Sequence, residues 1–348
     1  MSQPDLSILI VNWNSTAYLR KCLATLFAQT KGLDFEVVVI DSASFDGCGE
    51  MLQKEFPVVK FLQSRENIGF AASNNLAFRH SSGRTVVFLN PDTEIVGPAL
   101  KTMWDFVEST PQAGAVGCKL LNTDSSIQTS CVQRYPTLLN QFLDSELLRR
   151  LFPRAKVWGT QSLLEDGAPV AVEVISGACL MMKRSVCDQV GHFSTDYFMY
   201  AEDVDLCYRA QRAGYRNCYV GQATVVHHGG GSSTSIAKNN FAAIVVRDSL
   251  WKFLRKHRGP LYAAAYRIST ALQAIVRVAL LVAVLGVTLG QFRRHSLWLS
   301  LVKWTRLLSW AAGGEGWARQ LAHKSGLSDD LLQPPAASLR EEAPLRGA

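Results

Sequence analysis

Apolar runs that end in a polar or acidic side chain recur through the first 120 residues, and this pattern constrains the fold most. The run Thr85–Leu89 is followed by Asn90 and, two residues later, by Asp92, and the run Phe35–Ile40 is followed directly by Asp41. Each run has the length of a buried strand, and segments of helical periodicity separate the runs. This alternation predicts an α/β chain with a doubly wound, mostly parallel sheet.

The remaining apolar segments extend the same pattern. Further strands are predicted at Leu6–Val11, Val58–Leu62, Ala115–Leu120 and Arg216–Val226, with a strand-like stretch at Glu173–Lys183 that Gly177 interrupts. Helical spacing is found at Tyr18–Leu26, Met51–Phe56, a segment through Phe78, a stretch around Leu138–Leu151, and Val204–Ala213. The carboxyl ends of parallel strands form the ligand-binding edge of such sheets, so Asp41 and Asp92 are expected at that edge.

A third acidic cluster lies further along the chain, where Glu202 and Asp203 follow the aromatic run Tyr197–Tyr200. Carboxylates gathered at one sheet edge are suited to nucleotide recognition, metal binding and proton abstraction. The simpler alternative is that each acid only caps the helix after it. Three such acids together favour a ligand site.

Composition narrows the class of protein. Hydrophobic residues make up 48% of the 348 residues and charged residues 19%, which excludes a disordered chain. The net charge is +7, and residues 247–314 alone hold eleven basic residues and one acid. These charges alternate with apolar runs, which predicts an anionic membrane surface as partner and no nucleic acid. The eight cysteines form no CxxC pair, and no leader sequence is evident, which predicts a cytosolic protein without structural zinc.

The character of the chain changes after Asn240. Helices are predicted at Phe241–Phe253, Leu261–Gly290 and Leu297–Trp310, with Gly259 and Pro260 separating the first two. The uncharged part of the second, Val278–Gly290, is shorter than the roughly 20 residues that span a bilayer. A monotopic anchor in the membrane plane is therefore favoured over a spanning helix or a soluble dimerisation element. The predicted divisions are a catalytic domain at 1–240, a basic membrane-associating helical region at 241–325 and a disordered tail at 326–348.

Seven short stretches carry a family resemblance in a fixed order. They are Ile10–Asn14, Val39–Gly47, Asn67–Ala71 with Asn74 and Asn75, Leu89–Asp92, Ser176–Cys179, Tyr200–Leu206 and His227–Ser232. The chain resembles the family-2 glycosyltransferases of the GT-A fold, and within them the bacterial rhamnosyltransferase-like branch. The series covers residues 6 to about 235, whereas a dinucleotide oxidoreductase would carry a GxGxxG motif that is absent here.

The resemblance implies roles for the acidic residues. Asp203 is expected to be the general base of an inverting transfer, with Glu202 as its catalytic partner and Asp205 as a further candidate or a helix-dipole acid. Asp92 and His227 are expected to hold Mg²⁺ or Mn²⁺, although His227 or its neighbour His228 could also be structural. The family's Asp-x-Asp motif begins here with Asn90, so a single charged ligand remains at that motif.

The resemblance also implies a nucleotide-sugar site. The residues expected to form it are Asn14, Asp41, Asn67, Gly69, Asn75, Asn90 and Asp92. Asp41 would accept a hydrogen bond from the base, unless it only shapes the turn after its strand. Asn67 and Gly69 would close over the base and ribose, although ordinary strand-to-helix turns have the same composition. Gly229–Gly231 are expected to form a mobile loop over the donor.

Together these features predict a hexosyltransferase at the cytoplasmic face of the inner membrane that functions in cell-surface polysaccharide synthesis. The branch resemblance favours dTDP-rhamnose as donor, with UDP-sugars next. The expected acceptor is a glycan or a polyprenyl-linked intermediate. The alternative, suggested by Asn90, is a membrane scaffold that binds a nucleotide sugar without turnover.

Overall fold

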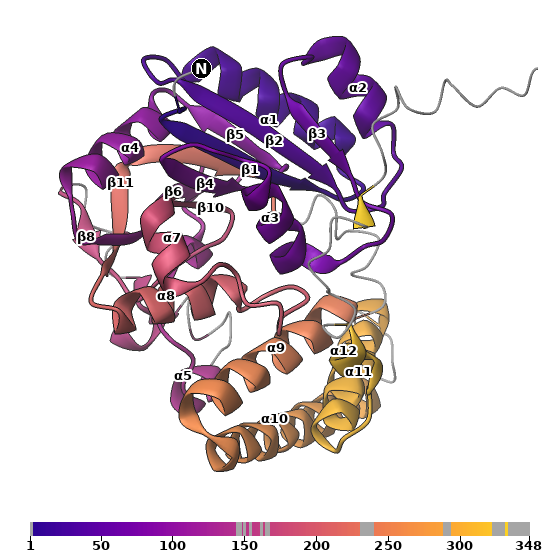
Figure 1. The fold of residues 1–348 in the computed structure, drawn as a ribbon. Helices are drawn as coiled ribbons and strands as arrows, with labels where there is room; N and C mark the ends of the chain where they lie inside the picture. The colour runs from indigo at the N-terminus through magenta and orange to yellow at the C-terminus, as the bar shows by residue number, and fades with distance from the viewer. Residues whose placement is uncertain are drawn as a thin grey trace, which may run out of the picture.

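The computed structural model describes residues 3–143, 148, 151–152, 155–160, 163, 168–229, 240–287, 294–321 and 331–332. Within them an α/β domain lies above a layer of helices (Figure 1). The strands of the main sheet are β1 (Leu6–Asn12), β2 (Phe35–Asp41), β3 (Lys60–Gln63), β4 (Thr85–Leu89), β5 (Thr93–Val96), β6 (Ala113–Leu121), β8 (Val170–Ala171), β10 (Cys179–Lys183) and β11 (Arg216–His227). A small second sheet pairs β7 (Val132–Gln133) with β9 (Val174–Ile175).

The main sheet has the order β3-β2-β1-β4-β10-β6-β11-β5, with β8 paired to β11. Strands β3, β2, β1 and β4 run parallel, as does β6 with β11. In contrast, β10 lies antiparallel between β4 and β6, and β5 lies antiparallel beside β11. The predicted mostly parallel α/β sheet is thus confirmed, with antiparallel insertions in its second half.

Helices cover both faces of this sheet. Those of the α/β domain are α1 (Thr16–Gln29), α2 (Cys48–Glu55), α3 (Gly69–Arg79), α4 (Ala99–Ser109), α5 (Leu138–Phe142), α7 (Arg184–Val190) and α8 (Glu202–Arg212). Helices α1 and α4 pack on one face, whereas α3 and α8 pack on the other (Figure 1). Strands β1, β2 and β4 are buried on both faces, which explains their continuous apolar sequences.

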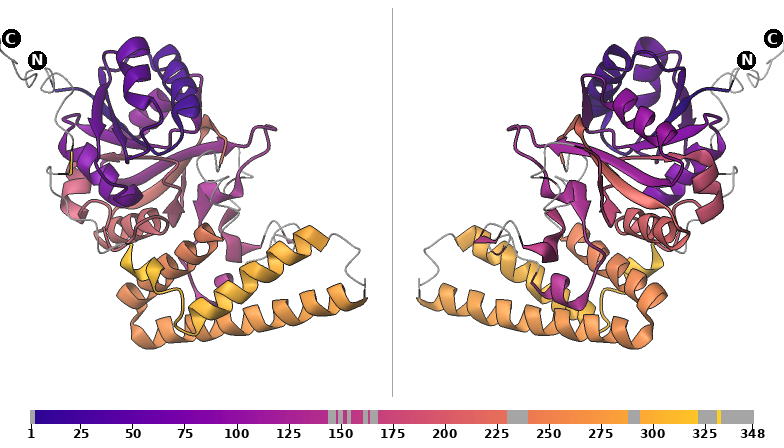
Figure 2. Two further views of the ribbon diagram at one scale, coloured as in Figure 1. Left: turned by 90° about the vertical axis from the view of Figure 1, so that its right-hand side faces the viewer. Right: turned by 90° about the vertical axis from the view of Figure 1, so that its left-hand side faces the viewer.

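The helical region follows the last strand. It consists of α9 (Phe241–Arg258), α10 (Pro260–Val287), α11 (Arg294–Ala311) and the short α12 (Trp317–Gln320). Gly259, with a φ of 93°, ends α9, and Pro260 begins α10, a position where its fixed φ suits a helix. Figure 2 shows α10 and α11 side by side as a long pair beneath the α/β domain.

Helix α10 is the one described helix that is long and apolar enough to cross a membrane by length and composition. It has 28 residues, and its most apolar window has a mean hydropathy of 2.2 with 11% of the window buried. At about 1.5 Å per residue its length exceeds the roughly 30 Å of a bilayer core. The C-terminal helical region with an apolar helix is therefore present as predicted.

Most of the predicted tail at 326–348 lies outside the described residues. Leu331 and Leu332 are described, and they run beside the end of β3. The backbone N–H of Arg65 donates to the carbonyl oxygen of Leu331 at 2.8 Å, and Leu332 forms an antiparallel bridge with Ser64. Gly230 and Gly231 of the predicted loop also lie outside the described residues.

Candidate active site

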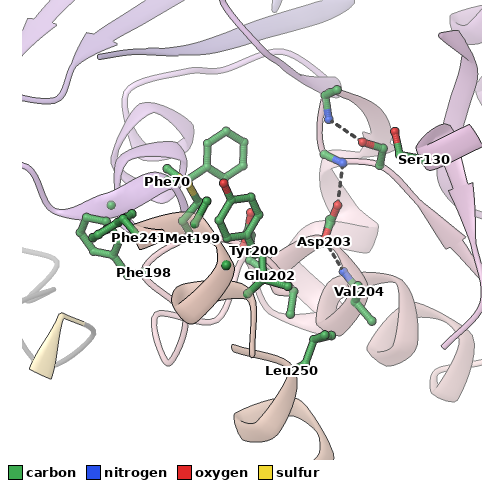
Figure 3. Close-up of a pocket in the computed structure, with 18 of the residues that line it drawn as sticks. Phe70, Ser130, Phe198, Met199, Tyr200, Glu202, Asp203, Val204, Phe241 and Leu250 are labelled. Carbon is green, nitrogen blue, oxygen red and sulfur yellow. Dashed lines mark hydrogen bonds between the residues drawn. The ribbon is translucent and has the colours of Figure 1, made fainter. Parts of the chain in front are cut away.

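A cavity of about 1320 Å³ opens at the carboxyl edge of the sheet. The ends of β1, β4 and β11 contribute to its wall, as does the start of α8, and Figure 3 shows its central part. Seven of the residues expected from the sequence line it: Asn67, Gly69, Asn90, Asp92, Glu202, Asp203 and His227. The structure therefore brings the three acidic clusters to one edge, although Asp41 does not line the cavity itself.

The acid pair begins helix α8. Tyr200 and Ala201 both adopt left-handed conformations, with φ values of 68° and 64°, and this turn directs Glu202 and Asp203 into the first helical turn. The two oxygens of Asp203 each accept a backbone N–H at 2.8 Å, one from Gly177 and one from Val204 (Figure 3). Asp203 is thereby fixed between the β9–β10 turn and its own helix.

The pKa values of these two carboxyls are raised to different extents. Burial raises the pKa of Glu202 well above its ordinary value, and the negative charge of Asp203 raises it further. Burial also raises the pKa of Asp203, but hydrogen bonds from the N–H groups of Gly177 and Val204 oppose that rise. The pKa of Glu202 is thus raised further than that of Asp203, which makes Asp203 the better candidate for the ionised carboxylate of the pair.

Glu202 also has a buried polar atom without a partner in the described part of the chain. Its side chain is only 5% exposed, and its Oε2 atom finds no hydrogen-bond partner among the described residues. Buried carboxyl oxygens are normally bonded, because leaving one unpaired costs free energy. A protonated Glu202 at the cavity wall can donate a hydrogen bond to a ligand.

A second group of polar side chains joins β4 to β11. The Nε2 atom of His227 lies 3.3 Å from Asp92 Oδ1 and 3.3 Å from Asn90 Nδ2. Gln128 fixes the ring, because its amide nitrogen donates to the carbonyl oxygen of His227 at 2.6 Å and its Oε1 lies 2.9 Å from Nδ1. Because Oε1 of Gln128 can only accept, Nδ1 carries a hydrogen, and Nε2 faces Asp92 and Asn90.

This arrangement fits a divalent cation. No cluster of three or more His, Cys, Asp or Glu ligands occurs among the described residues, so the chain would supply two donors, Asp92 and His227. Mg²⁺ is commonly bound by one or two carboxylates together with substrate phosphates, and Mn²⁺ also accepts imidazole. Asn90 donates its amide N–H toward His227, and a carboxylate in its place would repel Asp92.

Asp41 is fully buried, and a network within the protein occupies both of its carboxylate oxygens. Asn12 Nδ2 and Gln63 Nε2 each donate to it at 2.7 Å, and the Ser44 N–H donates at 3.0 Å. Nearby Asn14 is exposed, with a φ of 51°, between two residues that line the cavity. In this geometry Asp41 shapes the β2–α2 turn, and neither Asp41 nor Asn14 lines the cavity.

Asn75 also lies outside the cavity wall. Its amide nitrogen donates to the carbonyl oxygen of Phe193 at 2.7 Å, and its Oδ1 accepts the Phe193 N–H at 3.0 Å. Both ends of the amide are thus used to join α3 to the segment before α8, and the structure gives no support for contact with a donor.

Asn67 and Gly69 form the part of the wall next to the aromatic run. Asn67 Oδ1 accepts the Gly69 N–H at 3.0 Å, and the next residue, Phe70, donates its N–H to Phe198 at 2.8 Å. Gly69 has a φ of 83°, and a Cβ there would lie 2.4 Å from the carbonyl oxygen of Phe198. Glycine is therefore required for this close backbone approach.

Asp205 and His228 do not line the cavity. The carboxylate of Asp205 is fully buried, with His257 Nε2 at 2.6 Å and Arg209 Nε at 2.7 Å. His228 Nε2 lies 2.7 Å from Glu94 Oε1. Both side chains therefore hold neighbouring elements together, which leaves Asp203 as the base candidate and His227 as the imidazole that faces the cavity.

Several cavity residues were not expected from the sequence. Trp13 and Ser42 follow predicted strands and could have been identified by position, as could the aromatic residues Phe198 and Tyr200. The residues that the helical region contributes to the cavity could not be identified from the local sequence. It depends on how α9 and α11 pack beneath the sheet edge (Figures 1 and 2).

Comparison with known proteins identifies the family. Residues 7–191 match the model of glycosyl transferase family 2, and residues 154–319 match that of glycosyl transferase family group 2. The chain belongs to glycosyltransferase family 2, and the cavity at the sheet edge is its candidate active site.

Individual relatives agree with this assignment. The chain is 30% identical over 236 residues to N-acetylglucosaminyl-diphospho-decaprenol L-rhamnosyltransferase of Mycobacterium tuberculosis, covering 64% of this chain and 76% of that relative. It is 27% identical to rhamnosyltransferase WbbL of Escherichia coli, covering 64% of this chain and 82% of the relative. A mannosyltransferase from Pyrobaculum calidifontis, solved with GDP-Man and Mn²⁺, matches with a TM-score of 0.52 and 19% identity over 91% of this chain and 88% of its own. That similarity confirms the GT-A fold.

Proposed function

We propose that this protein transfers rhamnose from dTDP-rhamnose, with inversion, to a polyprenyl-diphosphate-linked glycan at the cytoplasmic face of the membrane. The observation that carries this proposal is the position of Asp203, a partly buried carboxylate held by two backbone N–H groups in the same cavity as Asp92 and His227. Two relatives of this chain are named as rhamnosyltransferases, and one of them is named for a diphospho-decaprenol acceptor.

The chain's own groups have defined tasks in such a transfer. Asp203 accepts the proton of the acceptor hydroxyl as that oxygen attacks the anomeric carbon, while the nucleoside diphosphate leaves from the opposite face. Glu202 stays protonated and donates a hydrogen bond to the acceptor, since its Oε2 is otherwise unpaired. Asp92 and His227 would hold the divalent cation, which supplies charge neutralisation for the leaving diphosphate.

The membrane contact is assigned to one face of α10. Ile268, Leu272, Val276 and Leu280 recur at helical spacing there, and each is more than half exposed. The opposite face of α10 packs on α9 and α11, and Arg277 interrupts the apolar sequence of the helix, with its guanidinium 5.5 Å from a tryptophan ring. A helix with one apolar face and one packed face suits a position in the membrane plane.

Nucleoside diphosphate release tests the proposal. The purified full chain is incubated with dTDP-, UDP- and GDP-sugars, with Mg²⁺ or Mn²⁺ or with EDTA, and with or without polyprenyl-linked acceptor lipids. Cation-dependent release from dTDP-rhamnose that increases with the acceptor lipid is expected. Binding of one donor without release from any would instead support the non-catalytic scaffold.

A further inference from the structure

The cavity that holds the acid pair continues past the sheet edge and ends against the helical region. Arg247 and Leu250 of α9 line this part, together with Lys303 and Trp304 of α11. Figure 3 shows Leu250 in the same cavity as Glu202. A ligand can therefore contact α8 and the membrane-associating helices at the same time.

Charge is divided between the two ends of this cavity. Asp92, Glu202 and Asp203 line the end at the sheet edge, whereas Arg247 and Lys303 line the end at the helices. Among the described lining residues, those from α9 and α11 include no acid. The cavity thus favours an anionic group beside Arg247 and Lys303 and disfavours one beside the proposed base, Asp203.

Arg247 makes hydrogen bonds to neighbouring side chains. Its Nη1 donates to the hydroxyl oxygen of Tyr266 at 3.1 Å and lies 3.4 Å from Oε1 of Gln141. These contacts hold the guanidinium at the cavity wall. A planar guanidinium held in this way can bind phosphate oxygens with two parallel hydrogen bonds.

The single acid of α9 is bonded to other groups. Asp248 is buried, its Oδ1 accepts the indole N–H of Trp310 at 3.2 Å, and its Oδ2 lies 3.0 Å from Lys252 Nζ. Asp248 is not among the residues that line the cavity. Its charge is balanced by Lys252, so Asp248 places no uncompensated negative charge next to the cavity.

An apolar surface adjoins the two cations. Trp304 and Leu307 of α11 line the cavity beside Lys303, and the Arg277 guanidinium of α10 lies 5.5 Å from the centre of the Trp304 ring. The cavity therefore combines an acid pair at the sheet edge with two cations and apolar side chains at the helices.

We infer that Arg247 and Lys303 bind the diphosphate of a lipid-linked acceptor and so place its sugar hydroxyl at Asp203. A sugar joined through a diphosphate to a hydrocarbon chain presents a hydroxyl, anionic groups and an apolar chain, which match the acid pair, the cations and the apolar side chains of the cavity. This inference rests on the proposed function and adds the acceptor site to it. The same cations could instead bind the phosphates of bulk anionic lipids, and the experiment separates these two sources.

Equilibrium binding tests the site without turnover. Binding of farnesyl diphosphate and of farnesol is measured with the purified full chain in an uncharged detergent. The wild type should prefer the diphosphate, and Arg247→Gln and Lys303→Gln should each weaken its binding by roughly tenfold or more, with partial recovery in Arg247→Lys. The matched control is Arg255→Gln, because Arg255 is exposed on α9 and outside the cavity. Equal binding of both ligands, or equal losses in the control, would overturn the inference.

Two further measurements are needed. One distinguishes a lipid-linked diphosphate from bulk anionic lipid as the ligand, and the other distinguishes failure of this acceptor site from failure of the proposed function. An excess of phosphatidylglycerol in detergent should not displace farnesyl diphosphate, and displacement at similar affinity would show a general headgroup site and overturn the inference. In transfer assays, Arg247→Gln should lower the preference for farnesyl-diphosphate-linked N-acetylglucosamine over the phosphate-free farnesyl glycoside by tenfold or more. Arginine-dependent diphosphate binding without any transfer would support this site and contradict the proposed function. Transfer by Arg247→Gln with an unchanged preference for the diphosphate-linked acceptor would support the proposed function and contradict this site.

Discussion

Asp205 links the catalytic helix to the helical region, and its replacement should destabilise the protein measurably. Its carboxylate lies on α8, two residues after Asp203, and accepts from Arg209 of α8 and His257 of α9, with Lys256 Nζ 3.4 Å away. Asp205→Asn keeps the size of the side chain and removes the charge that these three groups share. We expect α9 to loosen from α8 in this variant.

The magnitude follows from the pKa of Asp205. Burial alone would raise this pKa, but the hydrogen bond from His257 and the charges of Arg209 and Lys256 outweigh it and lower the pKa from 3.8 to about 2. At about 1.4 kcal/mol per pKa unit, the ionised carboxylate stabilises the fold by roughly 2.5 kcal/mol. Because the folded pKa is depressed, this stability is present above pH 3.8 and is lost as the pH falls toward 2.

Urea unfolding in detergent, followed by tryptophan fluorescence, measures the effect. Asp205→Asn should lower the free energy of unfolding by roughly 2.5 kcal/mol at pH 7, with the same difference at pH 5 and a smaller one at pH 3. Asp105→Asn is the control, because Asp105 is 53% exposed and its pair with Lys101 is worth less than about 1 kcal/mol. Equal urea midpoints for the two variants at pH 7 would show that the ionised Asp205 carboxylate does not stabilise the fold.

Three further predictions concern the site and the membrane. Gly69→Ala should lower kcat/KM for the donor by roughly tenfold or more, because its Cβ displaces Phe198; unchanged steady-state kinetics would exclude this contact as a constraint. The acidic limb of the kcat/KM profile should lie above pH 3.8, because burial raises the pKa of Asp203, and a limb at or below 3.8 would contradict an active base in this environment. Leu272→Glu with Leu280→Glu should move the protein from sedimented membranes to the supernatant, and continued sedimentation would exclude this face of α10 as the anchor.

The parallel half of the sheet could be predicted from the sequence because each strand is a continuous apolar run. The residue after β4, Asn90, and the last residue of β2, Asp41, were placed correctly at the carboxyl edge for the same reason. The central position of β10 could not be predicted. Its antiparallel pairing with β4 joins residues about 90 positions apart, and periodicity carries no information on such partners.

The roles of single polar residues were less accessible. Asn75 lies in a stretch that resembles a donor-binding motif, yet its amide is bonded to the backbone of Phe193, 118 residues away. In the same way, Asp205 could be read as a base until its partner His257 on α9 was located. Arg247 and Lys303 belong to the basic helical region recognised in the sequence, but only the packing of α9 and α11 places them in the cavity.

The central claim is that Asp203 is the base of an inverting transfer. The most direct measurement is the anomeric configuration of the product by NMR, made with dTDP-rhamnose and a diphosphate-linked acceptor for the wild type and Asp203→Asn. We expect a product with inverted configuration and a kcat that falls by roughly two to four orders of magnitude in the variant, with donor KM little changed. A product that retains the donor configuration, or a variant with undiminished kcat, would contradict it.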